Sequence, residues 1–147
     1  MTARWVVDEV QPHRDLNVTW QPISLFFKNE PDEQDQEEYY TRLLFTHKLL
    51  RVIESVRRTD GNDGVFALYW EYGRRIHHDR EKVFDPADAL KEAGLDVSHA
   101  DAFENDAFDG EIRTRMDVGL ELAGNDIGTP IIAFANDDDE TVALFGP

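Results

Sequence analysis

Apolar residues recur every three or four positions through the middle of the chain, and this spacing predicts helices. From Tyr39 to Arg58, the apolar face of an amphipathic helix contains Phe45, Leu49, Val52, Ile53 and Val56. A turn cluster, TDGNDG, follows, and the apolar spacing resumes at Val65, Leu68, Tyr69, Tyr72 and Ile76. We therefore predict two helices separated by a turn.

Two further helices are marked by residues that are typical of helix ends. In FDPADALKEAGL, Asp85 is placed to cap a helix, Pro86 to occupy its first position and Gly94 to end it. Asn105 is placed to cap a longer helix that ends at Gly124, with apolar positions at Phe108, Ile112, Met116 and Ala123. The acidic segment NEPDEQDQEE predicts a loop that leads into the first long helix.

The two ends of the chain combine a helix with segments that resemble strands. Residues 2–10 predict a helix without a visible N-cap. The alternating segment LNVTWQPISLFF places Val18, Trp20 and Ile23 on one side, which predicts a strand bent at Pro22. Close to the C-terminus, PIIAFA and TVALF flank the polar turn NDDDE and predict an antiparallel hairpin.

This order of elements predicts the fold class and the domain organisation. A helix, a strand, several helices and a hairpin are typical of an α/β domain. We predict one domain over residues 1–147, in which a helical segment of about residues 35–123 is inserted.

Composition narrows the classes of partner. The chain carries 31 acidic and 15 basic side chains, a formal net charge of −16, which disfavours nucleic acid and anionic membrane surfaces as partners. No apolar run approaches the roughly 20 residues of a membrane span, and the N-terminal residues lack the apolar core of a signal peptide. The expected location is therefore the cytoplasm.

The residue types exclude several kinds of catalytic site. There is no cysteine, so the chain has no thiol nucleophile, no disulfide and no cysteine-ligated metal. None of the five histidines, the neighbours His77 and His78 included, forms an i, i+4 pair that would bind zinc from one helix face, and we expect no metal. No phosphate-binding glycine loop and no nucleophile-elbow serine occurs.

The segment DIGTPIIAF contains the most informative local feature. A proline in the first position of a strand removes a donor from the ladder, so it belongs at an edge or a bend. The Thr129–Pro130 bond is therefore a candidate for the rare cis form. On spacing alone, an ordinary turn from a helix into a strand is the more frequent explanation.

Five segments together resemble one family of enzymes. They are TARW at residues 2–5, ISLFFKNE at 23–30, RRIHH at 74–78, DVGLELAGNDIGTPIIAF from 117, and LFGP at 144–147. Their order and spacing resemble the actinobacterial branch of the DsbA-like thioredoxin-fold oxidoreductases, which includes mycothiol-dependent reductases. The resemblance implies a thioredoxin-like fold with an inserted helical subdomain, a cis Pro130, no bound cofactor, and a low-molecular-weight thiol as reductant.

The resemblance also places two elements of that family outside these residues. The first strand and a Cys-Pro-x-Cys or Cys-Pro-x-Ala motif would precede Met1, and a C-terminal helix would follow Pro147. In that family the first cysteine attacks the substrate disulfide, so the resemblance implies no catalytic residue in this chain. The absent strand would leave unpaired sheet edges, which makes a homodimer plausible.

Substrate binding would then fall to residues that match the cleft of that family. The backbone of Thr129, before Pro130, would pair with the substrate as a strand does. Asn29 and Tyr39 match polar positions that line the cleft, and His77 matches a histidine near it. Each also has a purely structural explanation, as a loop cap, a first-turn aromatic and a helix end respectively.

Two hypotheses of function follow. The first is a thiol–disulfide oxidoreductase that acts on a small-molecule or protein substrate and whose cysteine motif precedes Met1. The alternative is a non-catalytic thioredoxin-like module that binds a thiol ligand or a peptide. A third, weaker hypothesis is a thiol-conjugate isomerase of the kappa-transferase kind, whose reactive residue would also lie upstream.

Overall fold

The computed structural model of the chain describes residues 5–32, 36–124, 128–136, 138 and 140–145. These residues are mostly helical, and the sheet that they form is one pair of short antiparallel strands. The expected α/β thioredoxin-like fold is therefore wrong for this part of the chain, because such a fold needs parallel strands joined by helical crossovers. The chain divides into two compact units, Trp20–Thr114 and the combination of Met1–Thr19 with Arg115–Pro147.

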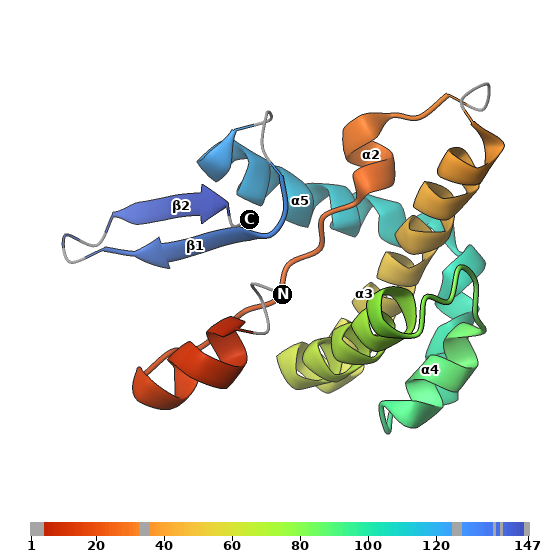
Figure 1. Cartoon of the computed structure of the whole chain (residues 1–147), viewed down its shortest axis with the longest axis horizontal. Coiled ribbons are helices and arrows are strands. Elements are labelled where there is room, and N and C mark those ends of the chain that lie inside the picture. The colour runs from red at the N-terminus through yellow and green to blue at the C-terminus, as the bar shows by residue number, and fades with distance from the viewer. Residues whose placement is uncertain (1–4, 33–35, 125–127, 137, 139, 146–147) are drawn as a thin grey trace. The chain divides into compact units, whose positions relative to one another are not determined.

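The unit Trp20–Thr114 is a set of helices built on one long helix (Figure 1). Its segments are α2 (Leu25–Asn29), α3 (Glu37–Gly73), η3 (Arg74–His78), α4 (Pro86–Glu92), η4 (Val97–Glu104), η5 (Asp106–Phe108) and the first turns of α5 (Asp109–Ala123). Helices α2, α4 and η4 all contact α3, and η4 also contacts α4. Helix α3 is thus the scaffold of this unit.

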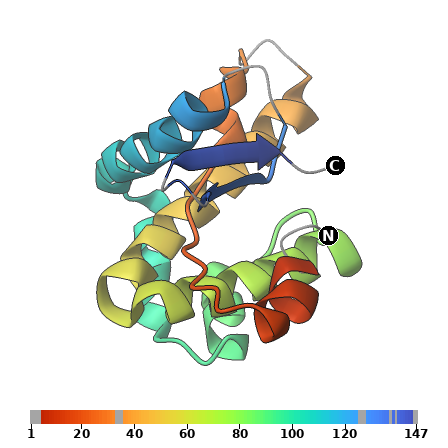
Figure 2. The same ribbon diagram turned by 90° about the vertical axis from the view of Figure 1, so that its left-hand side faces the viewer.

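Helix α3 consists of two helices joined at a kink, where the turn cluster TDGNDG predicts a break. Gly61 has φ 63° and ψ −152°, which lies outside the helical region and would strain any residue with a side chain. A Cβ added at Gly64 would lie 2.4 Å from the Cβ of Asp60, so the bend requires a second glycine. The two halves of α3 run in different directions, as Figure 1 and Figure 2 show.

The core of this unit is apolar and comes mainly from α3. Its buried members are Phe45, Leu49, Val52, Ile53, Val56, Val65, Leu68, Tyr72, Phe84, Ala89 and Leu90. The predicted apolar face of the long helices is confirmed except at Tyr69, which is 41 % exposed, and Ile76 is partly buried against the core. The ring of Phe84 packs edge-on against Phe45, with 5.3 Å between the centroids.

The predicted helix ends are confirmed where capping side chains mark them. The Asp85 carboxylate accepts a hydrogen bond from the backbone N–H of Ala87 at 2.8 Å, and α4 begins at Pro86. The side chain of Asn105 likewise accepts from the N–H of Ala107 at 3.1 Å, one turn before α5. These signals could be recognised in the sequence because a cap uses only its near neighbours.

The strand predicted in LNVTWQPISLFF is wrong. Residues 15–24 have no regular structure, and the segment ends in α2. Ser24 caps α2, because its hydroxyl oxygen accepts a hydrogen bond from the N–H of Phe27 at 3.1 Å. The backbone N–H of Trp20, which a strand would pair with a neighbouring strand, donates to Oδ1 of Asn62 at 3.0 Å. Helix capping and a side-chain acceptor thus replace strand pairing.

The other unit contains the predicted hairpin, which is confirmed. Strands β1 (Ile131–Ala135) and β2 (Thr141–Phe145) pair antiparallel, and Phe134 faces Val142 in the register. A Cβ added at Gly119 of α5 would lie 3.4 Å from Cδ1 of Ile131, so β1 packs closely on α5. The described part of the helix expected over residues 2–10 is present as η1 (Val6–Val10), which is followed by η2 (Gln11–His13).

One buried polar group in the core leads to a prediction. The hydroxyl of Tyr72 is buried and has no hydrogen-bond partner among the described residues, and burial raises the pKa of Tyr72. We expect Tyr72→Phe to raise the free energy of unfolding by about 1 kcal/mol, because the variant removes an uncompensated polar group. Urea unfolding measures this. Tyr39→Phe is the control: its hydroxyl accepts a hydrogen bond from Asn29, so a gain of equal size there would contradict the explanation.

Candidate functional site

A stripe of polar side chains runs along the first half of α3. His47, Arg51, Ser55 and Thr59 follow one another at four-residue intervals and therefore share one face of the helix. Each of the four contacts the segment of residues 97–109, which extends from η4 to the start of α5. Polar contacts thus join α3 to a part of the chain that is distant in sequence.

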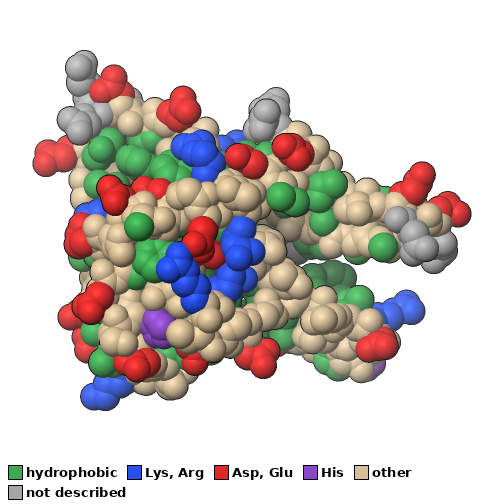
Figure 3. Space-filling view, turned by 180° about the vertical axis from the view of Figure 1, so that it is seen from behind, with side chains coloured by type: hydrophobic (Ala, Val, Ile, Leu, Met, Phe, Trp, Pro, Cys, Tyr) green, Lys and Arg blue, Asp and Glu red, His purple; other side chains and the backbone are tan. Residues whose placement is uncertain are grey.

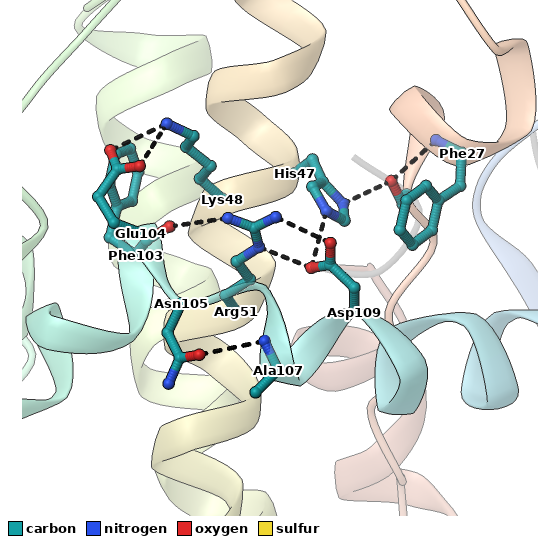
Figure 4. A network of polar contacts seen from close by, with 10 residues as sticks. Phe27, His47, Lys48, Arg51, Phe103, Glu104, Asn105, Ala107 and Asp109 are labelled. Atoms are coloured by element: carbon teal, nitrogen blue, oxygen red, sulfur yellow. Dashed lines mark hydrogen bonds and ion pairs between the residues drawn. The ribbon is translucent and has the colours of Figure 1, made fainter.

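Ser24, His47, Asp109 and Arg51 form one continuous network, which we call the polar relay. Figure 4 shows His47, Arg51 and Asp109 of this network. Oγ of Ser24 lies 2.9 Å from Nδ1 of His47, and Nε2 of His47 lies 3.1 Å from Oδ1 of Asp109. Arg51 donates to both carboxylate oxygens, from Nε to Oδ1 at 2.6 Å and from Nη2 to Oδ2 at 2.8 Å. The polar relay therefore connects the start of α2, the first half of α3 and the start of α5.

The partners of His47 assign its protons. An ionised Asp109 can only accept, so His47 must donate from Nε2. A neutral imidazole then has its acceptor at Nδ1, which takes the hydroxyl proton of Ser24. The oxygen of Ser24 in turn accepts from the backbone N–H of Phe27. Every hydrogen bond in this series runs in one direction, from the backbone of α2 to the carboxylate.

Burial and charge determine the protonation of the polar relay. The pKa of His47 lies below its ordinary value, mainly because the ring is only 1 % exposed and burial disfavours the cation. Arg51 lowers this pKa further by charge repulsion, and the carboxylate of Asp109 offsets only part of the decrease. Burial alone would raise the pKa of Asp109, but the hydrogen bond from Arg51 and the neighbouring charges outweigh it and lower that pKa. At neutral pH the polar relay thus holds a neutral imidazole beside an ion pair.

The order Ser–His–Asp is that of a hydrolase triad, but the surroundings do not suit nucleophilic catalysis. Ser24 is 1 % exposed, and its oxygen already accepts from Phe27, so a substrate carbonyl could reach it only if α2 moved. The rings of Phe26 and Phe27 lie 5.5 and 4.3 Å from the His47 ring, measured between centroids. The polar relay therefore holds α2 against α3 and does not present a nucleophile.

Helix α2 also carries a residue that was predicted to bind substrate. Asn29, the last residue of α2, donates from Nδ2 to the hydroxyl oxygen of Tyr39 at 2.9 Å, so the structure brings these two predicted residues together. Asn29 is exposed and Tyr39 is half-buried. The guanidinium of Arg42 lies 5.9 Å from the centroid of the Tyr39 ring. Asn29 and Tyr39 thus form a polar pair at the surface of the helical unit.

The other predicted site residues lie elsewhere in the chain. The Thr129–Pro130 bond is cis, which confirms that prediction; Thr129 is exposed and Pro130 half-buried, directly before β1. His77 is exposed in η3, and no hydrogen bond or ring contact joins it to Asn29 or Tyr39 within the described residues. However, Lys82 donates to Glu38 at 2.6 Å, which brings the segment after η3 back to the start of α3.

A second histidine is held by the same polar stripe. Oγ of Ser55 lies 2.8 Å from Nδ1 of His99, and Oγ1 of Thr59 lies 3.1 Å from Nε2. The carboxylate of Asp60 is 3.4 Å from the same Nε2. His99 is buried in η4, so this contact fixes η4 on α3 as the polar relay fixes α2.

Basic side chains on the surface are accompanied by acidic ones. On the face shown in Figure 3, Lys and Arg side chains gather near the middle with acidic side chains among them. Described ion pairs include Lys48 with Glu104 at 2.7 Å and Arg58 with Glu111. Within the described residues, no three His, Asp or Glu side chains come together as a metal site, and no helix is long and apolar enough to cross a membrane.

Our sequence reasoning missed the polar relay. Ser24 falls inside the strand that was wrongly predicted, and His47 was considered only as a possible zinc ligand. The available signal was the four-residue spacing of His47, Arg51 and Ser55, which places them on one face of a helix. Polar side chains on a helix face that is shielded from solvent need hydrogen-bond partners from elsewhere in the chain. That signal indicates that partners exist, but not that Asp109 and Ser24 supply them.

A model of one protein family matches residues 1–147, the whole of the chain. That family is described as Rv2466c-like, Mycothiol-dependent nitroreductase Rv2466c. It differs from the DsbA-like family that the five segments resemble, so the assignment by resemblance is wrong, and the match does not support DsbA-like thiol–disulfide exchange. The low-molecular-weight thiol expected as reductant agrees with the description of the matching family.

Proposed function

Because the chain belongs to the Rv2466c-like family of mycothiol-dependent nitroreductases, we propose that it binds mycothiol and takes part in the reduction of a small-molecule acceptor. The family is one of oxidoreductases that depend on a low-molecular-weight thiol. One observation carries the proposal: the match spans all 147 residues of a chain that has no cysteine. These 147 residues carry no thiol of their own, so in this proposal mycothiol supplies a reducing thiol to the reaction.

The electron balance of such a reaction is simple. Two thiols that form one disulfide release two electrons and two protons. A nitro group that becomes a nitroso group accepts two electrons and two protons and releases one molecule of water. The side chains of this chain then have to bind and orient the thiol, which requires polar groups and no redox-active residue.

Asn29 and Tyr39 are our candidates for polar groups that hold the thiol. Their mutual hydrogen bond uses neither the amide oxygen of Asn29 nor the hydroxyl proton of Tyr39, so with respect to the described residues an acceptor and a donor stay available for a ligand. Separately, and for the other unit alone, we propose that the backbone of the exposed residue Thr129, next to Pro130, pairs with an extended substrate as a strand would. His77 is a further, exposed candidate.

A direct binding experiment tests the proposal. Calorimetric titration of the 147-residue chain with mycothiol should give saturable binding, and Asn29→Ala should weaken it about 5- to 10-fold, the loss expected for one hydrogen bond. Asn17→Ala, which changes another exposed asparagine, is the matched control and should leave the affinity unchanged. A chain that is folded but does not bind mycothiol would refute the proposal.

A turnover assay separates the enzyme from the binding module. The chain is incubated with mycothiol and a nitroaromatic compound, and the loss of the nitro absorbance is measured. The background is the loss in the same mixture of mycothiol and nitroaromatic compound without the chain. Turnover above this background indicates that the chain is sufficient for catalysis. Binding without turnover favours the alternative, a non-catalytic module for a thiol ligand.

A further inference from the structure

His47 contacts both the cap and the aromatic side chains of α2, a helix that Tyr39, Tyr40 and Arg113 also contact. The helix has five residues, too few to be stable without packing. Its cap, Ser24, is hydrogen-bonded to Nδ1 of His47, and two of its aromatic residues, Phe26 and Phe27, lie against the same imidazole. One buried ring thus holds both the start and the body of α2.

We propose that the polar relay is an acid-sensitive latch that fixes α2 on α3 and thereby positions Asn29 for the bound thiol. The latch itself follows from the contacts of His47 alone. The positioning of Asn29 rests on the function proposed above.

Protonation of His47 opposes the observed hydrogen bonds. A proton on Nδ1 removes the acceptor of the Ser24 hydroxyl, which is buried and then lacks a partner for its own proton. The charged groups that face the ring are Asp109 and Arg113 from α5 and Arg51 from α3, while α2 contributes the uncharged rings of Phe26 and Phe27. The new cation would therefore meet two cations and one carboxylate that Arg51 already binds.

The direction of the pH effect follows from the protons bound in each state. With α2 in place, the pKa of His47 is lowered, whereas a solvated histidine has a pKa of about 6.5. The latched state therefore binds fewer protons than the loosened state at pH values between the lowered pKa of His47 and about 6.5. The latch is fully effective above about pH 6.5, and it weakens as the pH falls from there through the lowered pKa of His47.

The position of Asn29 links this latch to the ligand. Asn29 ends the helix that Ser24 begins, and its side chain reaches Tyr39 on α3. A loosened α2 would let Asn29 move away from Tyr39, so the two ligand-binding groups would no longer be held together. His47 is thus a positioning residue that acts through α2 and does not touch the ligand.

Amide hydrogen exchange tests the latch without any ligand. The N–H of Phe27 donates to Ser24, so its protection factor, corrected for intrinsic exchange, reports whether the cap is in place. Between about pH 7.5 and pH 5.0 we expect this factor to fall about fivefold in the natural chain. His47→Gln keeps a donor and an acceptor but does not titrate, and it should change less than about twofold.

Two further variants and one reference amide make this test decisive. Ser24→Ala removes the cap and should show low protection of Phe27 at every pH, even if the glutamine variant does not fold. His99→Gln alters the other buried histidine and should keep the pH dependence. A constant protection factor in the natural chain, an equal fall in His47→Gln, or an equal fall at Leu49 in the core would each overturn the latch.

Mycothiol titrations at the same two pH values test the positioning of Asn29. The dissociation constant should rise about fivefold at the lower pH in the natural chain and stay within about twofold in His47→Gln. If the dissociation constant for mycothiol were the same at both pH values while the protection factor of Phe27 fell, the positioning role of His47 would be overturned. Absence of binding at the higher pH would instead refute the proposed function, and the exchange experiment would still decide the latch.

Discussion

Asp109→Ala is expected to lower the free energy of unfolding by about 3 kcal/mol, because it leaves a mostly buried cation without its ion pair. Asp109 accepts two hydrogen bonds from Arg51 and one from His47, and the Arg51 side chain is 9 % exposed. The carboxylate also begins α5, where negative charge stabilises a helix. Urea unfolding followed by circular dichroism at about pH 7.5 measures the loss.

Glu111→Ala is the matched control for this prediction. Glu111 lies in the first turn of the same helix and pairs with Arg58, but the two side chains are 41 % and 54 % exposed. A pair so accessible to water is worth less than about 1 kcal/mol. Equal losses in the two variants would show that the polar relay contributes no more than a surface ion pair.

A double variant separates the ion pair from the space that it fills. Arg51→Met combined with Asp109→Leu removes both charges together and replaces them with apolar groups. It should be more stable than Asp109→Ala alone, because no unpaired charge is left buried. A double variant as unstable as the single one would indicate that the hydrogen bonds to Phe103 and His47 matter more than the charge.

The helices of the chain could be predicted because their signals are local. Asp85 and Asn105 cap helices through the N–H groups of residues two positions later, and the apolar spacing of α3 records which side is buried. The kink at Gly61 was likewise visible as a glycine-rich turn. In each case the residues that decide the structure lie within one or two helical turns of one another.

The error in the fold class came from a segment in which two local signals compete. Alternation of Val18, Trp20 and Ile23 favours a strand, whereas Ser24 favours a helix start three residues before Phe27. A strand also needs a partner, and the N–H of Trp20 finds Asn62 instead. Pairing is a long-range property, so the sequence pattern alone could not decide between the two.

The candidate site could be predicted only in part, for a related reason. Asn29 and Tyr39 were named, and they meet in the structure, but no pattern linked them to each other. Asp109 reaches His47 across 62 residues of sequence, so a helix-length window cannot reveal that contact. The sequence did contain a stripe of polar residues on α3. This stripe indicates that its side chains need hydrogen-bond partners, but it does not show which residues those partners are.

Leu68→Ala is expected to lower the free energy of unfolding by about 3 kcal/mol, through a different cause. Leu68 has no exposed surface, belongs to the apolar core and lies in the second half of α3, beyond the kink. Truncation there removes buried methyl groups and leaves a cavity that the neighbours fill only partly. Thermal or urea unfolding measures the loss, and Val83→Ala, at a residue that is 67 % exposed, should change stability by less than about 0.5 kcal/mol.

Leu68→Ala and Asp109→Ala should differ in what else they change, although their losses of stability are similar. Leu68 is apolar and makes no contact in the polar relay, so its variant should keep the pH dependence of Phe27 protection while global stability falls. Asp109→Ala removes the acceptor of His47 and should shift that dependence. If both variants changed the exchange of Phe27 in the same way, α2 would be controlled by overall stability, and the polar relay would have no separate role in holding it.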